Sequence, residues 1–407
     1  GYGVIAADKG IKTIGAYAFC HYNFNNEAEV EKDEDGYYDI DLKKEPIGNN
    51  TITSVVIPDG VETIEKYAFY NCKLLEKVTL PDTLKTIGEQ AFASCSVLRN
   101  INLGKVRIIR DKAFNNCDSL TCDDIGGMDL SSLYAVGAYA FEGTRFTSVR
   151  LDSLSRVSEG AFANCKYLTN VVLGERTRIS ANMFQNTPIK EIVIYSDSIS
   201  DYAFSGCTKL ERVVIKNSIS YLGIEAFSGC TNLKDVVFEG SCEKIAERAF
   251  YNCTSLATFN LPVGNIIIYD NAFASSGIQN LVFKPDTYIT DMGVCVFDNV
   301  ERFNVDITGS NYYKEVDDVI YTKDDSVLVL VLSGYNSNRT YTVPAEVKEI
   351  FAGAFSSNKH IRYVVFEEGS LLTTIGNGAF ANCKNLRSVT LPANRITVDD
   401  YAFFNTT

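Results

Sequence analysis

The chain has 407 residues, of which 46% are hydrophobic and 22% charged, and this composition excludes an intrinsically disordered protein. Its net charge of -13 disfavours binding to nucleic acid or insertion at anionic membranes, because we find no local cluster of basic residues. The apolar stretch Val327–Leu332 has six residues, far short of the roughly 20 that a membrane-spanning helix needs.

A phenylalanine, usually preceded by alanine, recurs along the whole chain. Most successive copies are 20 to 27 residues apart, and two gaps measure 50 and 58 residues. We interpret the two long gaps as insertions, at about 22–50 and about 304–342, in a repeat of about 23 residues. The fifteen anchors are Phe19, Phe69, Phe92, Phe114, Phe141, Phe162, Phe184, Phe204, Phe227, Phe250, Phe273, Phe297, Phe355, Phe380 and Phe403.

The first insertion, at about 22–50, is strongly acidic. Asp33, Asp35, Asp39 and Asp41 stand near Gly36, which is faintly similar to a calcium-binding loop. No glutamate stands at the position that closes an EF-hand loop. We interpret the segment as a solvated acidic loop, with adventitious calcium binding as the alternative.

The second copy of the repeat shows how one unit is built. Val78 and Leu80 alternate with polar residues, which predicts a short strand with one face inward. Pro81 ends this strand because proline cannot donate a hydrogen bond to the next rung. Leu84 and Ile87 then return to the core. Prolines in the matching place are Pro58, Pro262, Pro344 and Pro392.

Two columns of small residues follow each phenylalanine. The residue two positions later is Asn, Gly or Ser in fourteen copies, which predicts a tight bend with positive φ. The next residue is a small one that suits a site near buried backbone polar groups. We expect free buried thiols there, with disulfides between adjacent coils as the alternative. The cysteines of this column are Cys72, Cys95, Cys117, Cys165, Cys207, Cys230, Cys253 and Cys383.

A single unit cannot fold alone, because its few buried side chains do not offset the backbone entropy of about 23 residues. Stacked units bury each other and pair their strands, so the sequence predicts a repeat solenoid. We expect one solenoid domain over residues 1–407, about 15 coils long, with the shape of a curved, elongated rod and a monomeric state.

The repeat resembles the BspA-like, or Treponema pallidum-type, leucine-rich repeats. The residues from Cys72 to Phe92 carry the motif C-x-x-L-x-x-V-x-L-P-x-x-L-x-x-I-G-x-x-A-F most completely. This resemblance implies a right-handed α/β superhelix of short strands joined by short helical or irregular turns. The second insertion is similar to a hairpin of that family, with strands at Val319–Tyr321 and Val327–Leu330.

The same resemblance implies a function. Members occur on gut and oral bacteria and some mucosal protozoa, and membership implies a secreted or surface-anchored protein that binds host proteins, other bacteria or glycans. We therefore expect an adhesion or recognition protein outside the cell. The alternative is a passive spacer that presents a neighbouring domain, and the uncapped last coil leads us to expect that the native chain continues.

Catalytic and metal-binding motifs are not found in the sequence. The two histidines, His21 and His360, are far apart, and we interpret them as surface or turn residues. Cys117 and Cys122 form no C-x-x-C pair, so zinc is not expected. We predict a protein that is not an enzyme and has no cofactor.

The outward strand positions are the candidate binding surface. A row of valines occupies these positions in the middle coils, and aligned apolar residues on an exposed face often mark binding. The alternative is structural, since β-branched residues suit strands without any partner. The candidate ligand-binding residues are Val172, Val193, Val214, Val237 and Val282, bordered by Lys190, Arg212 and Lys234, with Glu211 beside them.

Overall fold

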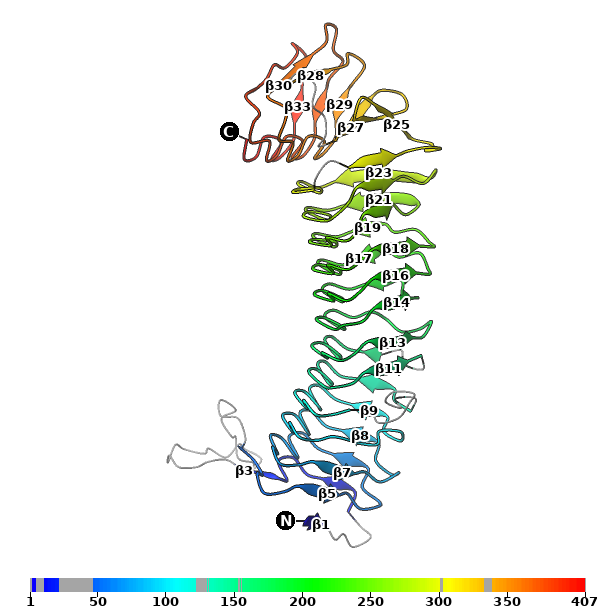
Figure 1. Cartoon of the computed structure of the whole chain (residues 1–407), viewed down its shortest axis with the longest axis vertical. Helices are drawn as coiled ribbons and strands as arrows, with labels where there is room; N and C mark the ends of the chain where they lie inside the picture. The colour runs from blue at the N-terminus through cyan, green and yellow to red at the C-terminus, as the bar shows by residue number, and fades with distance from the viewer. Residues whose placement is uncertain are drawn as a thin grey trace, which may run out of the picture. The chain divides into compact units, whose positions relative to one another are not determined.

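The computed structural model describes residues 2–4, 11–21, 47–121, 130, 132–152, 154, 156–300, 303–332 and 339–406. Over these residues the protein is a β-solenoid built from short strands and turns (Figure 1), which confirms the predicted repeat fold. Where helical or irregular connections were expected, the described residues form turns and no helix. The chain divides into two compact units, Gly1–Thr177 and Arg178–Thr407, and each is described by itself.

Each regular coil contributes two strands. The first follows the cysteine turn and contains the predicted Val-x-Leu alternation, whereas the second directly precedes the Ala-Phe turn and usually has two residues. The sequence predicted the first strand but only an apolar return for the second, because two residues are too few to show alternation. Strands of one kind pair in parallel from coil to coil, so first strands form sheets with first strands and second strands with second strands, and each kind is divided into several sheets along the chain.

In unit Gly1–Thr177 the first strands form two groups. They are β1 (Tyr2–Val4), β5 (Ser54–Val56) and β7 (Lys77–Thr79), and then β11 (Ser148–Leu151) with β13 (Asn170–Leu173). The second-strand sheet consists of β2 (Thr13–Ile14), β6 (Thr63–Ile64), β8 (Thr86–Ile87), β9 (Ile108–Ile109), β10 (Ala135–Val136) and β12 (Arg156–Val157). A small antiparallel pair, β3 (Cys20–His21) and β4 (Ile47–Gly48), lies at the two ends of the acidic insertion.

Unit Arg178–Thr407 contains two stacks of coils. The middle stack has first strands β14 (Glu191–Ile194), β16 (Arg212–Ile215), β18 (Asp235–Phe238), β20 (Thr258–Asn260), β22 (Asn280–Val282) and β24 (Asn304–Asp306). Its second strands are β15 (Ser198–Ile199), β17 (Tyr221–Leu222), β19 (Lys244–Ile245), β21 (Gly264–Ile268) and β23 (Thr287–Met292). In Figure 1 the turns of these coils follow one edge and the strands follow the other.

The C-terminal stack begins with the second insertion. Its first strands are β28 (Thr340–Val343), β30 (Tyr363–Phe366) and β32 (Ser388–Val389). Its other sheet runs from β25 (Tyr313–Val316), β26 (Val319–Thr322) and β27 (Val327–Val331) to β29 (Glu349–Ile350), β31 (Thr374–Ile375) and β33 (Thr397–Val398). Both kinds of sheet in the middle stack end before this stack starts, so the ladder is interrupted here.

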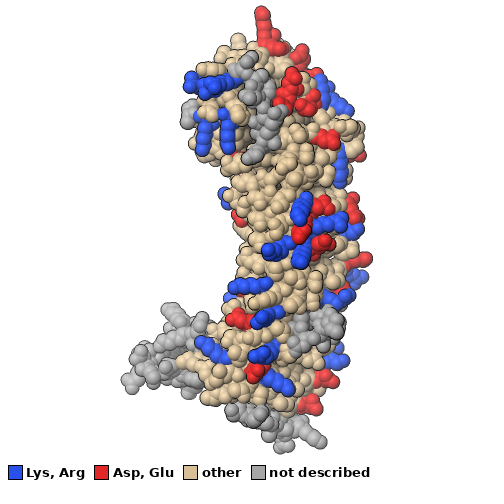
Figure 2. Space-filling view, viewed as in Figure 1, with Lys and Arg blue, Asp and Glu red and all other residues tan. Residues whose placement is uncertain are grey.

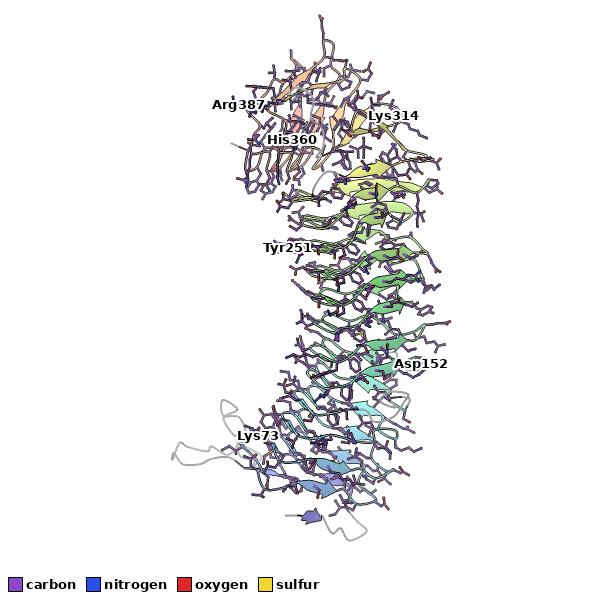
Figure 3. The ribbon with its side chains drawn as sticks, viewed as in Figure 1. Lys73, Asp152, Tyr251, Lys314, His360 and Arg387 are labelled. Carbon is purple, nitrogen blue, oxygen red and sulfur yellow. The ribbon has the colours of Figure 1, made fainter. Side chains whose placement is uncertain are left out.

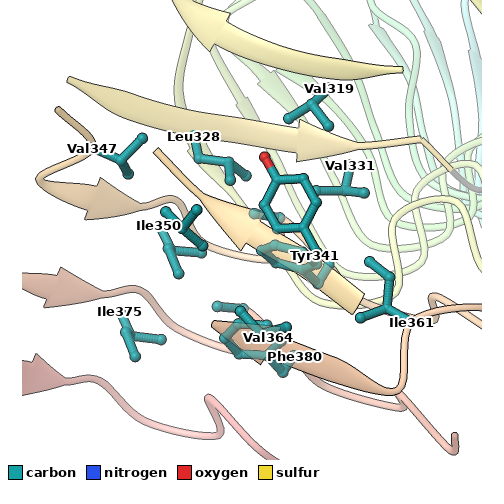
Figure 4. Close-up of a cluster of buried hydrophobic side chains, with 14 of the residues drawn as sticks. Val319, Leu328, Val331, Tyr341, Val347, Ile350, Ile361, Val364, Ile375 and Phe380 are labelled. Atoms are coloured by element: carbon teal, nitrogen blue, oxygen red, sulfur yellow. The ribbon is translucent and has the colours of Figure 1, made fainter. Parts of the chain in front are cut away.

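The predicted hairpin is confirmed, and it contains one more strand than expected. Strands β25, β26 and β27 pair in antiparallel order, and β27 then pairs in parallel with β29 of the following coil. The hairpin residues Val319, Leu328 and Val331 are buried in one core with Tyr341 of β28, as Figure 4 shows. The hairpin therefore serves as the first layer of the C-terminal stack.

The anchor phenylalanines stack ring on ring, as the repeat model requires. Neighbouring rings from Phe69 to Phe162 are nearly parallel, with centroids 5.0 to 5.5 Å apart. A second file runs from Phe184 to Phe297, and a third joins Phe355, Phe380 and Phe403. Each coil therefore buries the aromatic face of the next.

The Ala-Phe turn pairs its backbone donors alternately with the next coil and with itself. The N–H groups of Tyr67, Phe69 and Asn71 donate to carbonyl oxygens of the following coil, at 2.9, 2.7 and 2.8 Å. The intervening donors of Ala68 and Tyr70 reach carbonyls three residues earlier in the same turn. Every donor of this stretch is thus satisfied without a helix or a strand.

Positive φ occurs at two positions of this turn. All fourteen Asn, Gly and Ser residues two positions after the phenylalanine have positive φ, as predicted. The residue two positions before each of the fifteen phenylalanines has it as well, and the sequence did not reveal this. Residues such as Tyr67, Lys112 and Arg248 hold this conformation although nothing in their chemistry favours it, because the ladder to the next coil fixes the backbone.

Candidate functional site

The candidate surface lies on the outward face of strands β14, β16 and β18. In the parallel register Val193 lies opposite Val214, and Val214 lies opposite Val237, so three of the five predicted valines form one row. Val193 is 38% exposed, and the other two are partly buried. We call Val193, Val214 and Val237 the valine row.

The remaining two valines lie in other sheets. Val172 is exposed on β13 of the first unit, where it pairs with Arg150 of β11. Val282 is partly buried on β22, between Asn260 of β20 and Asp306 of β24. The sequence placed all five in one stripe because it could not show where strand pairing between coils is interrupted.

Charged residues flank the valine row on both sides. On the side toward the strand start, the Arg212 Nε atom lies 3.0 Å from Asp235 Oδ2. On the other side, beyond the strand end, Lys216 Nζ lies 2.5 Å from Glu239 Oε1, a pair that the sequence reading missed. Figure 2 shows side chains of both charges gathered over the middle of the chain. The row is therefore an apolar line between cross-coil ion pairs.

Two further predicted residues lie just before these strands. Lys234 Nζ is 3.0 Å from Glu211 Oε2, and Lys190 is exposed one coil earlier. The hydrogen bond and charge of Lys234, together with the weaker field of Lys190, lower the pKa of Glu211. The predicted cations Arg212 and Lys234 thus already pair with acids of this chain, which leaves the surface close to electrically balanced.

The cysteine column lies inside the solenoid and makes a regular set of hydrogen bonds. Thiols of this column donate to the carbonyl oxygen of the phenylalanine one coil earlier, at 3.0 to 3.2 Å, as the expected position near buried polar backbone requires. Thr144 and Thr187 replace the thiol and donate to Phe141 and Phe184 of their own coils. All described cysteines of this column are free thiols.

Burial makes these thiols poor nucleophiles. Desolvation raises the pKa of Cys207 to about 11 and that of Cys165 to about 12, although the hydrogen bonds with Thr187 and Thr144 oppose the shift. With pKa values this high, these thiols stay protonated at neutral pH. They are therefore unreactive, because the thiolate is the reactive form. The column therefore has a structural role.

The other residues considered in the sequence do not converge on a site. His360 is exposed in the coil of Phe355, and His21 lies on β3. Cys122 and the acidic residues Asp33, Asp35, Asp39 and Asp41 lie outside the described residues. Within the described ranges no three His, Cys, Asp or Glu side chains are grouped so that they could hold a metal ion. Over the same ranges, no helix has the length and apolar character needed to cross a bilayer.

One exposed residue of the outward face was missed. Val56 ends β5 in the same outward position as Thr79 of β7, with which it pairs, and it is 48% exposed. The proline two positions later, Pro58, was the signal that could have located it.

Comparison with known proteins identifies the repeat. Residues 47–304 and 331–407 are covered by matches to the BspA type leucine rich repeat region, with boundaries at 47–169, 122–210, 177–304 and 331–407. No curated protein matches the sequence.

Solved structures to which the chain is similar include a leucine-rich repeat protein from Bacteroides ovatus ATCC 8483. It is 22% identical, with a TM-score of 0.50 over 84% of this chain and 79% of its own, which supports the fold. A leucine rich cell surface protein from Faecalibacterium prausnitzii A2-165 is 21% identical over 78% of this chain and 79% of its own, with a TM-score of 0.36. The T. pallidum leucine rich repeat protein is 28% identical over 46% of this chain and 80% of its own, with a TM-score of 0.35.

Proposed function

Because the chain belongs to the BspA-type leucine-rich repeat family, we propose that it is a secreted or cell-surface recognition protein of bacterial origin. In this proposal it has no catalytic activity and binds a host or bacterial surface protein or glycan through the outward face of its first strands.

The observation that carries the proposal is the valine row. Three valines, one exposed and two partly buried, lie side by side on adjacent strands, and their flanking charges are paired with one another. An apolar line between paired charges favours a partner that covers the row with apolar groups and meets the rim with polar ones. The rigid backbone ladder holds this pattern in place, so little ordering is needed on binding.

A variant with Val193→Thr, Val214→Thr and Val237→Thr tests the proposal. Threonine keeps the β-branched shape and the strand preference but replaces one exposed methyl group by a hydroxyl. A screen of the wild-type chain against host matrix proteins, bacterial surface proteins and mucosal glycans first supplies a partner. We expect the triple variant to bind that partner at least about tenfold more weakly, which corresponds to about 1.4 kcal/mol over three sites.

The matched control replaces three valines that lie off the outward face of the first strands, Val97, Val316 and Val398, which are 36%, 49% and 45% exposed. The control variant should bind like the wild type, and both variants should unfold at nearly the wild-type temperature. Equal affinity of the triple variant and the wild type for the partner would exclude the valine row as the binding surface.

A further inference from the structure

An open hollow of about 390 Å³ lies on the Ala-Phe turns of the middle stack. Its lining includes an aromatic residue, Tyr251, which Figure 3 shows at the edge of the stack where the turns lie. A separate cavity of about 360 Å³ lies beside Asn358, where the middle stack and the C-terminal stack meet, and the two share only Asn299. The hollow therefore belongs to the regular coils and not to the junction between the stacks.

The hollow exists because one large side chain stands between small ones. The Gly229 N–H donates to the carbonyl oxygen of Tyr251 at 2.8 Å, and the Asn252 N–H donates to that of Ala274 at 3.1 Å. These bonds place the residues that directly follow the anchor phenylalanines side by side. In four successive coils these residues are Ser228, Tyr251, Ala274 and Asp298. Serine and alanine are small, so they leave space on both sides of the tyrosine ring.

The ring of Tyr251 lacks the aromatic partner that such a ring has in other coils. Two other coils have an aromatic residue directly after the anchor phenylalanine, and each packs edge-on against a tyrosine three residues earlier. The ring centroids of Tyr67 and Tyr70 are 5.5 Å apart, and those of Tyr401 and Phe404 are 6.0 Å apart. Tyr251 is 39% exposed and makes no aromatic or cation–π contact with another described residue. Its ring is therefore available to a ligand.

The charges of the hollow favour a neutral ligand. Arg248 stands three residues before Tyr251, and its Nη1 and Nε atoms lie 3.6 Å from Glu225 Oε1 and 3.7 Å from Glu247 Oε1. Asp298 also lines the hollow and makes no ion pair with another described residue. The acidic groups thus outnumber the basic one, which disfavours an anion, and the guanidinium in the same wall disfavours a cation.

The uncharged polar side chains of the hollow have free capacity for hydrogen bonds. Those of Asn271 and Ser275 make no hydrogen bond with another described residue. The carboxylate of Asp298 accepts only one long bond, from Asn299 Nδ2 at 3.4 Å. An amide and a hydroxyl group both donate and accept, whereas a carboxylate only accepts. A ligand with several hydroxyl groups matches this set, because each hydroxyl can do both.

We propose that this hollow binds one ring of a neutral sugar. One face of a sugar ring carries C–H groups and can lie against the negative face of the Tyr251 ring. The hydroxyl groups of the sugar would then bond to Asn271, Ser275 and Asp298. The volume lies near the lower end of the roughly 300 to 1,000 Å³ that is typical of small-molecule sites, which suits a single ring. A lipid is disfavoured, because most side chains of the lining are polar.

Saturation-transfer NMR titrations of the full chain with the methyl glycosides of β-galactose, β-glucose, α-mannose and β-N-acetylglucosamine test the proposal. We expect saturable binding of at least one of them at millimolar concentration. Tyr251→Ala should weaken that binding about tenfold, whereas Tyr251→Phe keeps the ring and should stay within about twofold of the wild type. Tyr269→Ala is the matched control, because Tyr269 is 40% exposed and lies outside the lining of the hollow. The control should leave the affinity unchanged.

Two charged probes test the choice of a neutral ligand. The methyl glycoside of N-acetylneuraminic acid is anionic and should bind at least about tenfold more weakly than the best neutral glycoside. Nα-acetyl-lysine methylamide carries a cation that could lie on a tyrosine ring, and it should not bind saturably. Tighter binding of either charged probe than of every neutral glycoside would overturn the proposal.

The site is separate from the valine row, so the two proposals fail independently. The variant with Val193→Thr, Val214→Thr and Val237→Thr should bind the glycoside as the wild type does, and a loss in this variant would exclude the hollow as the sugar site. The proposal would also be overturned if none of the neutral glycosides bound at millimolar concentration, or if Tyr251→Ala and Tyr269→Ala lost equal affinity.

Discussion

Phe204 and Phe403 occupy the same place in the repeat but very different surroundings. Phe204 is fully buried, with the ring of Phe184 on one side and that of Phe227 on the other. Phe403 stacks only on Phe380 and is 36% exposed. The identical residue is a core residue in one coil and a partly exposed one in the other.

The two coils show that burial in this protein is supplied by the neighbouring coil. The column that contains Cys207 in the inner coil contains Thr406 in the outer one, and Thr406 donates to the carbonyl of its own Phe403. The inner coil makes backbone hydrogen bonds to the coils on both of its faces. On one face, the N–H groups of Tyr202 and Phe204 donate to the following coil. Stability should therefore depend on position in the stack more than on the repeat sequence.

The largest expected effect separates the two phenylalanines. Phe204→Ala leaves a cavity between two rings and should reduce the free energy of unfolding by about 3 to 5 kcal/mol. Phe403→Ala removes a ring that is already partly hydrated, and about 1 kcal/mol is expected. Urea denaturation followed by circular dichroism measures both. Equal losses for the two variants would show that the neighbouring coil does not determine the burial energy.

The cysteine column offers a second test of the comparison between the inner coil and the last coil. Burial raises the pKa of Cys207 from its ordinary value of 9.0 to about 11. Between pH 9 and about 11 the folded state therefore retains the thiol proton that the unfolded state has lost. The contribution of this thiol to the free energy of unfolding is complete below pH 9 and is lost as the pH rises through about 11.

Cys207→Ser removes this titration, since serine does not ionise in that range. Between pH 9 and about 11 the wild type should lose stability faster than Cys207→Ser by about 1.4 kcal/mol for each pH unit. As a positional control, Thr406→Cys places a thiol in the exposed coil and should react quickly with iodoacetamide at pH 8. Peptide mapping distinguishes the two thiols, and rapid labelling of Cys207 in the folded protein would contradict its burial.

Much of the fold was predictable because the same type of residue recurs at the same position in many coils. A column of Asn, Gly and Ser reveals positive φ, and an alternating pair such as Val78 and Leu80 reveals a short strand, here β7, in which Val78 faces inward and after which Leu80 is half-buried. The second strand and the second positive-φ column were not predictable. Two residues such as Thr86 and Ile87 show no period, and Tyr67 or Arg248 adopts positive φ only because intercoil hydrogen bonds impose it.

The candidate surface was predictable in part. The outward positions follow from the strand period, so Val193, Val214 and Val237 were found as one row. Their ion-paired surroundings and the separation of Val282 depend on the register between coils, which a single repeat does not encode. The cavity beside Asn358 depends on how two stacks meet, which no single repeat encodes.

The smallest of these effects concerns the junction between the middle stack and the C-terminal stack, where neighbouring coils no longer continue one strand ladder. Gly353 has φ +65°, and a Cβ atom there would lie 2.4 Å from the carbonyl oxygen of Gly293 in the middle stack. Gly369 has φ +80° with nothing within 4 Å of the added atom, so Gly369→Ala carries the backbone penalty alone. We expect Gly353→Ala to lower the free energy of unfolding by about 1 to 3 kcal/mol more than Gly369→Ala, because a backbone carbonyl cannot turn away as a side chain can. Paired urea titrations measure the difference. If the two variants were equally stable, the close approach of the C-terminal stack to Gly293 would not exist in solution.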